Sequence, residues 1–401
     1  MDSVPVHAIS GMGTPDLRGS YGTFTLFSDA PSVPQRSQIE GGLFVRVAAE
    51  DHHYKLKLEG PADPFHAKGA TANIEIEVFR DPWEKVIRVV LPDQELILKQ
   101  GEWSEWLPLS FKLLPLFASV GGMVRLYVKE VHPHFQLYVS PINVDPMNPS
   151  LPICSPAGYS RELSEAVGRF YTQGFPADSS ALSSGALSDD EYLAQSKIVL
   201  EENERMFHYQ LERFREGLFF FYFSSIDQNS HMLWRNFDPT HPLYNPNASA
   251  EVKNALRFYY KKMDSYLQAA LNKVDSSTTL IALSDHGFAP FYREFHLSSW
   301  LVANGFTVLQ DPEGSSPGEF YDRVDWAKTK AYALGINGIY LNLAGREANG
   351  SLSPSSAAEV KREIIAKLRL VTDPVDGRKV LVEAYDTSEL YQGPFLALAP
   401  D

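Results

Sequence analysis

The sequence predicts an α/β protein in which a β-rich region precedes a larger region with a mainly parallel sheet. Apolar and polar residues alternate in short segments between residues 42 and 128, the pattern of half-buried strands. Between residues 188 and 283, amphipathic helical segments alternate with short apolar runs, the order typical of parallel strands joined by crossover helices. A proline-rich stretch, residues 141–156, separates the two patterns.

The β-rich region contains several segments of period two, separated by turn residues. They predict the strands of a small sandwich. The predicted strands lie at residues 42–48, 53–58, 72–78, 86–91, 95–98 and 123–128.

In the α/β region, Ser188 and Glu191 form the sequence signature of a capping box, which predicts a helix from there to about Gly217. The next run, residues 218–223, is apolar throughout, as in strands covered on both faces. The remaining predicted elements are a helix at 251–273, a strand at 279–283, a helix at 355–369 and a strand at 380–385.

Composition narrows the functional classes. The net charge of the 401-residue chain is −14, which disfavours binding to nucleic-acid polymers or anionic membranes. A small phosphorylated substrate is compatible with this charge, because bound cations would reverse the local field. One cysteine excludes an internal disulfide framework. No stretch reaches the length of a transmembrane helix, and no targeting segment identifies the compartment.

Two predicted strands end in the same pair of residue types. Asp227 and His231 follow the run 218–223, and Asp285 and His286 follow the run 279–283. Because sites in open parallel sheets lie beyond the carboxyl ends of the strands, we expect these four side chains to share a pocket. Aspartate and imidazole ligands favour zinc, with manganese or iron as alternatives. Taken singly, each motif is also explained by a helix cap or a turn.

Three nearby residues have two interpretations each. Gly287 would permit an unusual backbone that turns Asp285 and His286 toward one mouth. Arg235 is a candidate to clamp a phosphate oxygen, and an ion pair with Asp238 is the alternative. His296 is near enough in sequence to be a ligand, but a supporting role is favoured.

At these residues the sequence resembles the type I phosphodiesterase/nucleotide pyrophosphatase branch of the alkaline phosphatase superfamily. The resemblance spans roughly residue 141 to the C-terminus, with a further short piece at residues 11–16. The segments that carry it are 225–231, 284–288, 297–301 and 331–342. It implies an alkaline-phosphatase-like core with a β-rich insert, divided as an N-terminal core segment at 1–28, the insert at 29–140 and an incomplete α/β metal-binding domain at 141–401.

The resemblance implies a hydrolase of phosphodiester or nucleotide pyrophosphate bonds that uses two divalent ions, most often zinc, with manganese as an alternative. Asp227 and His231 would hold one ion, and Asp285 and His286 the other. A Thr or Ser nucleophile, an Asp on the first strand and a late His are also expected, and none is found in this sequence. We therefore expect a chain truncated at both ends, with weak metal binding and little turnover by itself.

Two alternatives remain open at this point. One keeps the fold and changes the reaction to that of a phosphotransferase or mutase. The other is a non-catalytic relic whose β-rich domain serves binding. The oligomeric state and compartment stay undetermined, and an extracytoplasmic location would follow from a lost targeting segment.

Overall fold

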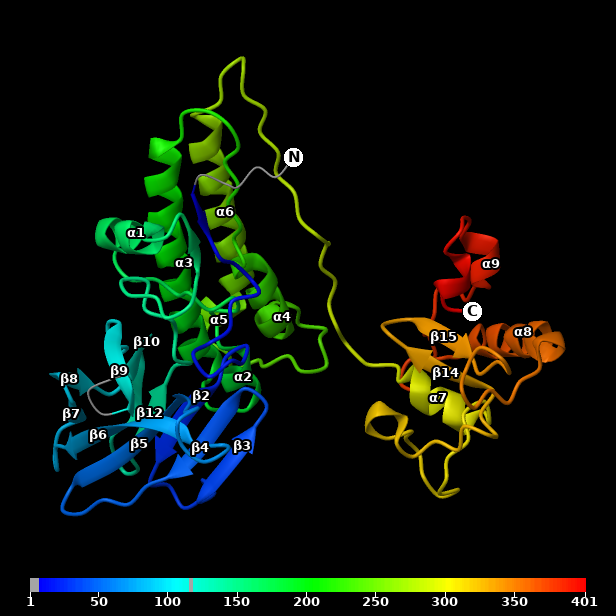
Figure 1. Cartoon of the computed structure of the whole chain (residues 1–401), viewed down its shortest axis with the longest axis horizontal. Coiled ribbons are helices and arrows are strands. Elements are labelled where there is room, and N and C mark those ends of the chain that lie inside the picture. Colours follow the sequence, from blue (N-terminus) through cyan, green and yellow to red (C-terminus); the bar gives the residue numbers. More distant parts are fainter. Residues whose placement is uncertain (1–6, 115–117) are drawn as a thin grey trace. The chain divides into compact units, whose positions relative to one another are not determined.

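The computed structural model describes residues 7–114 and 118–401. The chain divides into two compact units, Met1–Pro290 and Phe291–Asp401. Figure 1 shows the first unit with its strands and its helices gathered in separate layers. The prediction of a mixed α/β protein is confirmed.

The first unit contains the β-rich region. A five-stranded sheet has the order β11–β12–β2–β4–β3, and a four-stranded sheet has the order β5–β6–β7–β8. The larger sheet is formed by β2 (Phe24–Ser28), β3 (Arg36–Ile39), β4 (Gly42–Arg46), β11 (Leu126–Glu130) and β12 (Gln136–Val139). The smaller sheet is formed by β5 (His53–Ala62), β6 (Thr71–Arg80), β7 (Val86–Leu91) and β8 (Gln94–Lys99). Two shorter antiparallel pairs are β9 (Leu107–Leu114) with β10 (Ala118–Val124), and β1 (Ala8–Ile9) with β13 (Cys154–Ser155).

The five-stranded sheet is the middle layer of this unit, because its two faces are covered by different elements. Leu137 and Val139 of β12 pack with the strands of the four-stranded sheet. Tyr138, between them in sequence, packs with the helices. Successive side chains on a strand point to opposite faces, so the fully apolar stretch of β12 contributes to two cores at once.

The helices on the other face of this sheet lie at two predicted positions and at three, residues 159–167, 179–183 and 225–237, that the periodicity did not predict. They are α1 (Tyr159–Val167), α2 (Ser179–Ser183), α3 (Asp189–Arg213), α4 (Ser225–Phe237), α5 (Ala250–Lys253) and α6 (Ala255–Leu271). The capping box of α3 is confirmed, since Ser188 and Glu191 exchange side-chain and backbone hydrogen bonds. The helix predicted at 251–273 is confirmed with one break at Asn254. In the described part of the chain, no helix has both the length and the apolar character needed to cross a membrane.

The second unit is a small α/β unit with its own core. Its elements are α7 (Leu297–Ala303), η1 (Glu319–Tyr321), β14 (Ala331–Leu334), β15 (Gly338–Leu341), η2 (Pro354–Ser356), α8 (Ala357–Leu368), α9 (Thr387–Leu390) and η3 (Leu396–Leu398). The antiparallel pair β14–β15 packs against α7 and α8 around Leu301, Leu341 and Ile364. The helix predicted at 355–369 is confirmed.

The prediction of a mainly parallel sheet is wrong for the described residues. Residues 218–223, 279–283 and 380–385 form no strand there, and β2 with β4 is the one parallel pair among the described named strands. The side chains at 218–223 still alternate: Phe219, Phe221 and Phe223 pack on the helices, while Leu218 is 90% and Phe220 is 74% exposed. The apolar run at 279–283 is exposed throughout. An apolar run alone therefore does not make a buried strand, because a ladder also needs a partner strand.

A buried ion pair joins the β-rich layers to α3. The Arg125 guanidinium donates to Glu202 Oε1 at 2.8 Å, and the Trp106 indole N–H donates to the same oxygen at 2.9 Å. The Tyr171 backbone N–H donates to Glu202 Oε2 at 2.8 Å. The Glu202 and Arg125 side chains are only 2% and 6% exposed. Burial raises the pKa of Glu202, and the neighbouring Arg125 charge acts in the opposite direction.

A second buried carboxyl group, that of Asp178, caps α2. It accepts hydrogen bonds from the Ala181 backbone N–H at 2.8 Å and from the Tyr138 hydroxyl at 2.5 Å. Burial raises its pKa to about 6, against the lowering effect of these hydrogen bonds. The folded protein therefore binds a proton at Asp178 more tightly than the unfolded chain does.

This shift predicts a pH dependence of stability. Between the unfolded pKa of about 4 and the folded value, the folded state binds more protons, so stability falls as the pH rises. The free energy of unfolding of the unaltered protein should therefore fall by about 3 kcal/mol between pH 4 and pH 7.5. We expect Asp178→Asn to abolish this fall. Urea denaturation of both proteins across this range measures it. An unchanged pH slope in the variant would show that another group carries the effect.

Candidate metal centre

Helix α4 places the first two predicted ligands on one face. Asp227 lies in its first turn, where the helix dipole stabilises a negative charge. His231 follows one turn later, and residues four apart are neighbours on a helix surface. The His231 Nε2 atom lies 3.4 Å from Asp227 Oδ1.

The second pair of predicted ligands is held against α4 by an aromatic contact. The Phe288 ring stacks on that of Trp234, with ring centroids 5.3 Å apart and an interplanar angle of 20°. The same ring meets His231 edge-on, with centroids 4.8 Å apart. Because Phe288 follows Asp285 and His286 closely in sequence, these contacts bring both residues to the Asp227 end of the helix.

The two imidazoles converge on one oxygen of Asp227, and His286 also contacts Asp285. The His286 Nε2 atom lies 3.7 Å from Asp227 Oδ1 and 3.6 Å from Asp285 Oδ2. Asp227 Oδ1 is buried and accepts no hydrogen bond from any described residue. A buried carboxylate oxygen without a hydrogen bond is strongly unfavourable unless a cation or a proton donor faces it.

Hydrogen bonding orients the His286 ring. Its Nδ1 atom contacts the Gly287 carbonyl oxygen at 2.8 Å, so Nδ1 carries the proton and Nε2 faces the carboxylates. This arrangement is typical of metal-binding imidazoles, in which the far nitrogen donates to a carbonyl. The hydrogen bond to Gly287, followed by the charges of Asp285 and Asp227, raises the pKa of His286.

Tyr222 is a member of this region that sequence reasoning missed. Burial and the negative charges of Asp227 and Asp285 raise the pKa of its phenol, so its side chain lies within the field of both carboxylates. Residue 222 belongs to the apolar run 218–223, in which the sequence predicts residues of the hydrophobic core. Its position on the face opposite Phe221 and Phe223 is the signal that could have identified it.

The donor set fits a divalent cation by its chemistry, although the described residues hold no preformed site. Two carboxylates and two imidazoles are ligands that zinc and manganese accept, and Asp227 Oδ1 accepts no hydrogen bond from the described residues. Within residues 7–114 and 118–401, no group of three or more His, Cys, Asp or Glu side chains has the arrangement of a formed metal site. In the present geometry, the imidazoles contact the carboxylates directly.

Other predicted residues lie elsewhere or have other partners. Arg235 pairs with Asp189 of α3 at 2.5 Å, whereas the sequence suggested a phosphate or Asp238. His296 precedes α7 in the second unit, with its Nε2 atom 3.3 Å from Glu294. Gly287 has no left-handed backbone conformation, so the turn there does not depend on glycine in the way predicted.

Three threonine hydroxyls near the N-terminus belong to local structure. Thr14 bonds to Ser10 and to the Gly11 carbonyl oxygen, and Thr23 bonds to Ser20. Thr25 is buried in β2. Within the described residues, no serine or threonine hydroxyl makes a hydrogen bond to any of the four predicted ligands.

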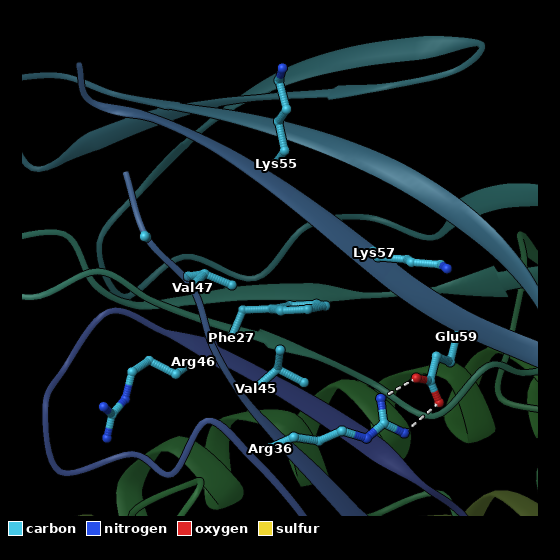
Figure 2. A pocket seen from close by; sticks show the side chains of 9 residues that line it. Phe27, Arg36, Val45, Arg46, Val47, Lys55, Lys57 and Glu59 are labelled. Carbon is cyan, nitrogen blue, oxygen red and sulfur yellow. Dashed lines mark hydrogen bonds and ion pairs between the residues drawn. The ribbon is translucent and has the colours of Figure 1, made fainter. Parts of the chain in front are cut away.

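A cavity of about 330 Å³ lies in the β-rich region, away from these ligands in sequence. Figure 2 shows Phe27, Val45 and Val47 near its centre and the Arg36–Glu59 ion pair at one side. Arg46 points away from the ion pair and donates to the carbonyl oxygens of Val33 and Pro31. The arginines of this cavity thus already have partners.

The comparisons agree with the resemblance that the motifs show. The family model described as type I phosphodiesterase / nucleotide pyrophosphatase matches residues 131–397. This range includes all four predicted ligands and both units of the structure from β12 onward. No curated protein and no solved structure matches the chain.

Proposed function

Because the chain belongs to the type I phosphodiesterase/nucleotide pyrophosphatase family, we propose that it acts on phosphodiester or nucleotide pyrophosphate bonds with the help of divalent metal ions, zinc first and manganese second. The observation that carries this proposal is the approach of two imidazoles to Asp227: the Nε2 atoms of His231 and His286 lie 3.4 and 3.7 Å from its Oδ1 atom, and His286 Nε2 also lies 3.6 Å from Asp285 Oδ2. The two segments come from distant positions in the chain, and both lie in the matched range.

The chain's own residues would bind the metal ions and hold one another in position. Asp227 and His231 are the candidate ligands of one ion, and Asp285 and His286 of the other. Two such ions would stabilise the charge on the attacking and leaving oxygens of a phosphoester. Phe288, stacked on Trp234, fixes the second pair of ligands relative to α4. The Gly287 carbonyl oxygen keeps His286 Nε2 available as a ligand.

We further propose that this chain supplies no hydroxyl nucleophile at the candidate metal centre. The absence of a serine or threonine bonded to the four ligands, among the residues that the structure describes, supports this view. General acid–base and electrostatic assistance without a positioned nucleophile gives only part of an enzyme's acceleration.

A hydrolysis assay tests both parts of the proposal. With zinc present, we expect bis(p-nitrophenyl) phosphate to be cleaved with kcat below about 1 s⁻¹, the low end of ordinary enzymes. The residual activity should exceed that on p-nitrophenyl phosphate and disappear in Asp227→Asn. Ordinary turnover would contradict the missing nucleophile, and activity indifferent to zinc and to Asp227 would contradict the metal-dependent proposal.

A further inference from the structure

A smaller cavity lies where the β-rich layers meet the helices. Its volume is about 220 Å³, and we call it the arginine pocket. It is lined by Glu105, Trp106, Arg125, Gly168, Arg169 and Arg205. Three guanidinium groups therefore line one small cavity in a chain whose net charge is −14.

The three arginines differ in how many of their donors are already used. Arg169 gives Nε and Nη2 to Asp145, at 3.0 and 3.2 Å. Arg205 gives only Nε, to the Val167 carbonyl oxygen at 3.0 Å. Because a guanidinium has five N–H donors, both terminal nitrogens of Arg205 remain available, and Arg205 forms no ion pair within the described residues.

Arg125 makes the pocket a built feature of the fold. Its side chain is 6% exposed and bonded to Glu202, and the Ser104 carbonyl oxygen accepts from Nη1 at 2.6 Å. Its guanidinium carbon lies 4.9 Å from the Trp106 ring centroid. These contacts fix the Arg125–Glu202 ion pair at the wall of the cavity, and they use no donor of Arg205.

Among the described residues, Glu105 is the one carboxylate that lines the pocket, and it is loosely placed. Its side chain is 97% exposed, with Oε2 at 3.8 Å from Arg125 Nη1. An exposed ion pair of this kind contributes little stability. A stronger oxyanion could therefore displace the Glu105 carboxylate.

We propose that the arginine pocket binds a small oxyanion of the phosphate class, either free phosphate or the phosphate group of a small monoester. Arg205 and Arg169 would donate hydrogen bonds to it, as guanidinium groups do to phosphate oxygens. The site is separate from the metal centre and does not depend on the proposed hydrolytic function.

Calorimetric titration of the full chain with inorganic phosphate tests this site. The buffer is free of divalent metals, so that the metal centre does not contribute, and chloride keeps the ionic strength constant. We expect saturable binding, weakened about tenfold in Arg205→Gln through the loss of charged hydrogen bonds. Arg205 is exposed on α3, so this variant should fold. Glu105→Gln should tighten binding by about threefold, because it removes the competing carboxylate.

Arg88→Gln is the matched control, since Arg88 is an exposed arginine on β7 paired with Glu95. It should leave phosphate binding unchanged. A parallel titration with glycerol phosphate distinguishes the two sources of the oxyanion. Tighter binding of inorganic phosphate would indicate free phosphate, and tighter binding of glycerol phosphate would indicate a small monoester. Absence of saturable binding by both probes, or equal binding by the Arg205→Gln variant, would overturn the proposal.

Discussion

Glu202→Ala is expected to lower the free energy of unfolding of the first unit by about 3–5 kcal/mol, the usual effect of removing one partner of a buried ion pair. The variant leaves the buried Arg125 guanidinium with only the exposed Glu105 carboxylate, 3.8 Å away, as a counterion, and with the Ser104 carbonyl oxygen as its remaining strong contact. The Trp106 indole N–H and the Tyr171 backbone N–H would lose their acceptor as well.

Urea denaturation compares this variant with two others. Arg88→Met breaks an exposed pair, in which Arg88 Nη2 lies 3.2 Å from Glu95 Oε2, and should change stability by less than about 1 kcal/mol. The double variant Arg125→Met with Glu202→Leu should be more stable than Glu202→Ala, since no charge is left unpaired. A Glu202→Ala effect as small as that of Arg88→Met would contradict the assigned role of the buried pair.

Asp227→Asn is expected to weaken zinc binding by at least about tenfold, because a neutral amide replaces the carboxylate on which both imidazoles converge. The amide is nearly the same size as the carboxylate, so the fold should remain. Calorimetric titration with zinc measures the change in affinity.

The matched control is Asp264→Asn, which neutralises an exposed aspartate of α6. Both variants change the net charge equally, so a difference between them reflects position and not the overall field. Equal zinc affinities in the two variants would show that Asp227 is not a ligand.

Several elements could be predicted because their signal is local. The capping box at Ser188 and Glu191 fixes the start of α3 through contacts within one turn. The alternation in β5, whose residues Tyr54, Leu56 and Leu58 are buried, follows from the two-residue period of a strand. The capping interactions lie within one turn of the chain, and the alternation reflects the geometry of the strand itself, although the ladder of β5 is formed with β6.

The segments at 218–223 and 279–283 show where local reasoning ends. Their apolar character predicts burial, but hydrogen bonding to a neighbouring strand depends on residues far away in the chain. The predicted ligands nevertheless come together without that sheet. The contacts of Phe288 with Trp234 and His231 replace the strand ends as the device that joins the two motifs, and no spacing rule predicts such a contact.

The arginine pocket could not be predicted from the sequence for a related reason. Arg125, Arg169 and Arg205 come from a strand-to-strand connection, a loop and a helix. Each arginine alone reads as an ordinary surface cation. Only the packing of α3 against the β-rich layers, held by Glu202, places the three side chains around one cavity.

Anomalous scattering at the zinc absorption edge, from crystals of this chain grown with zinc, is the most direct measurement of where divalent ions bind. Peaks at coordination distance, about 2.0–2.2 Å, from the side chains at positions 227, 231, 285 and 286 are the predicted result. A peak beside Cys154 instead, or a density map in which those four side chains face separate surfaces, would contradict the metal centre and the hydrolytic function proposed from it.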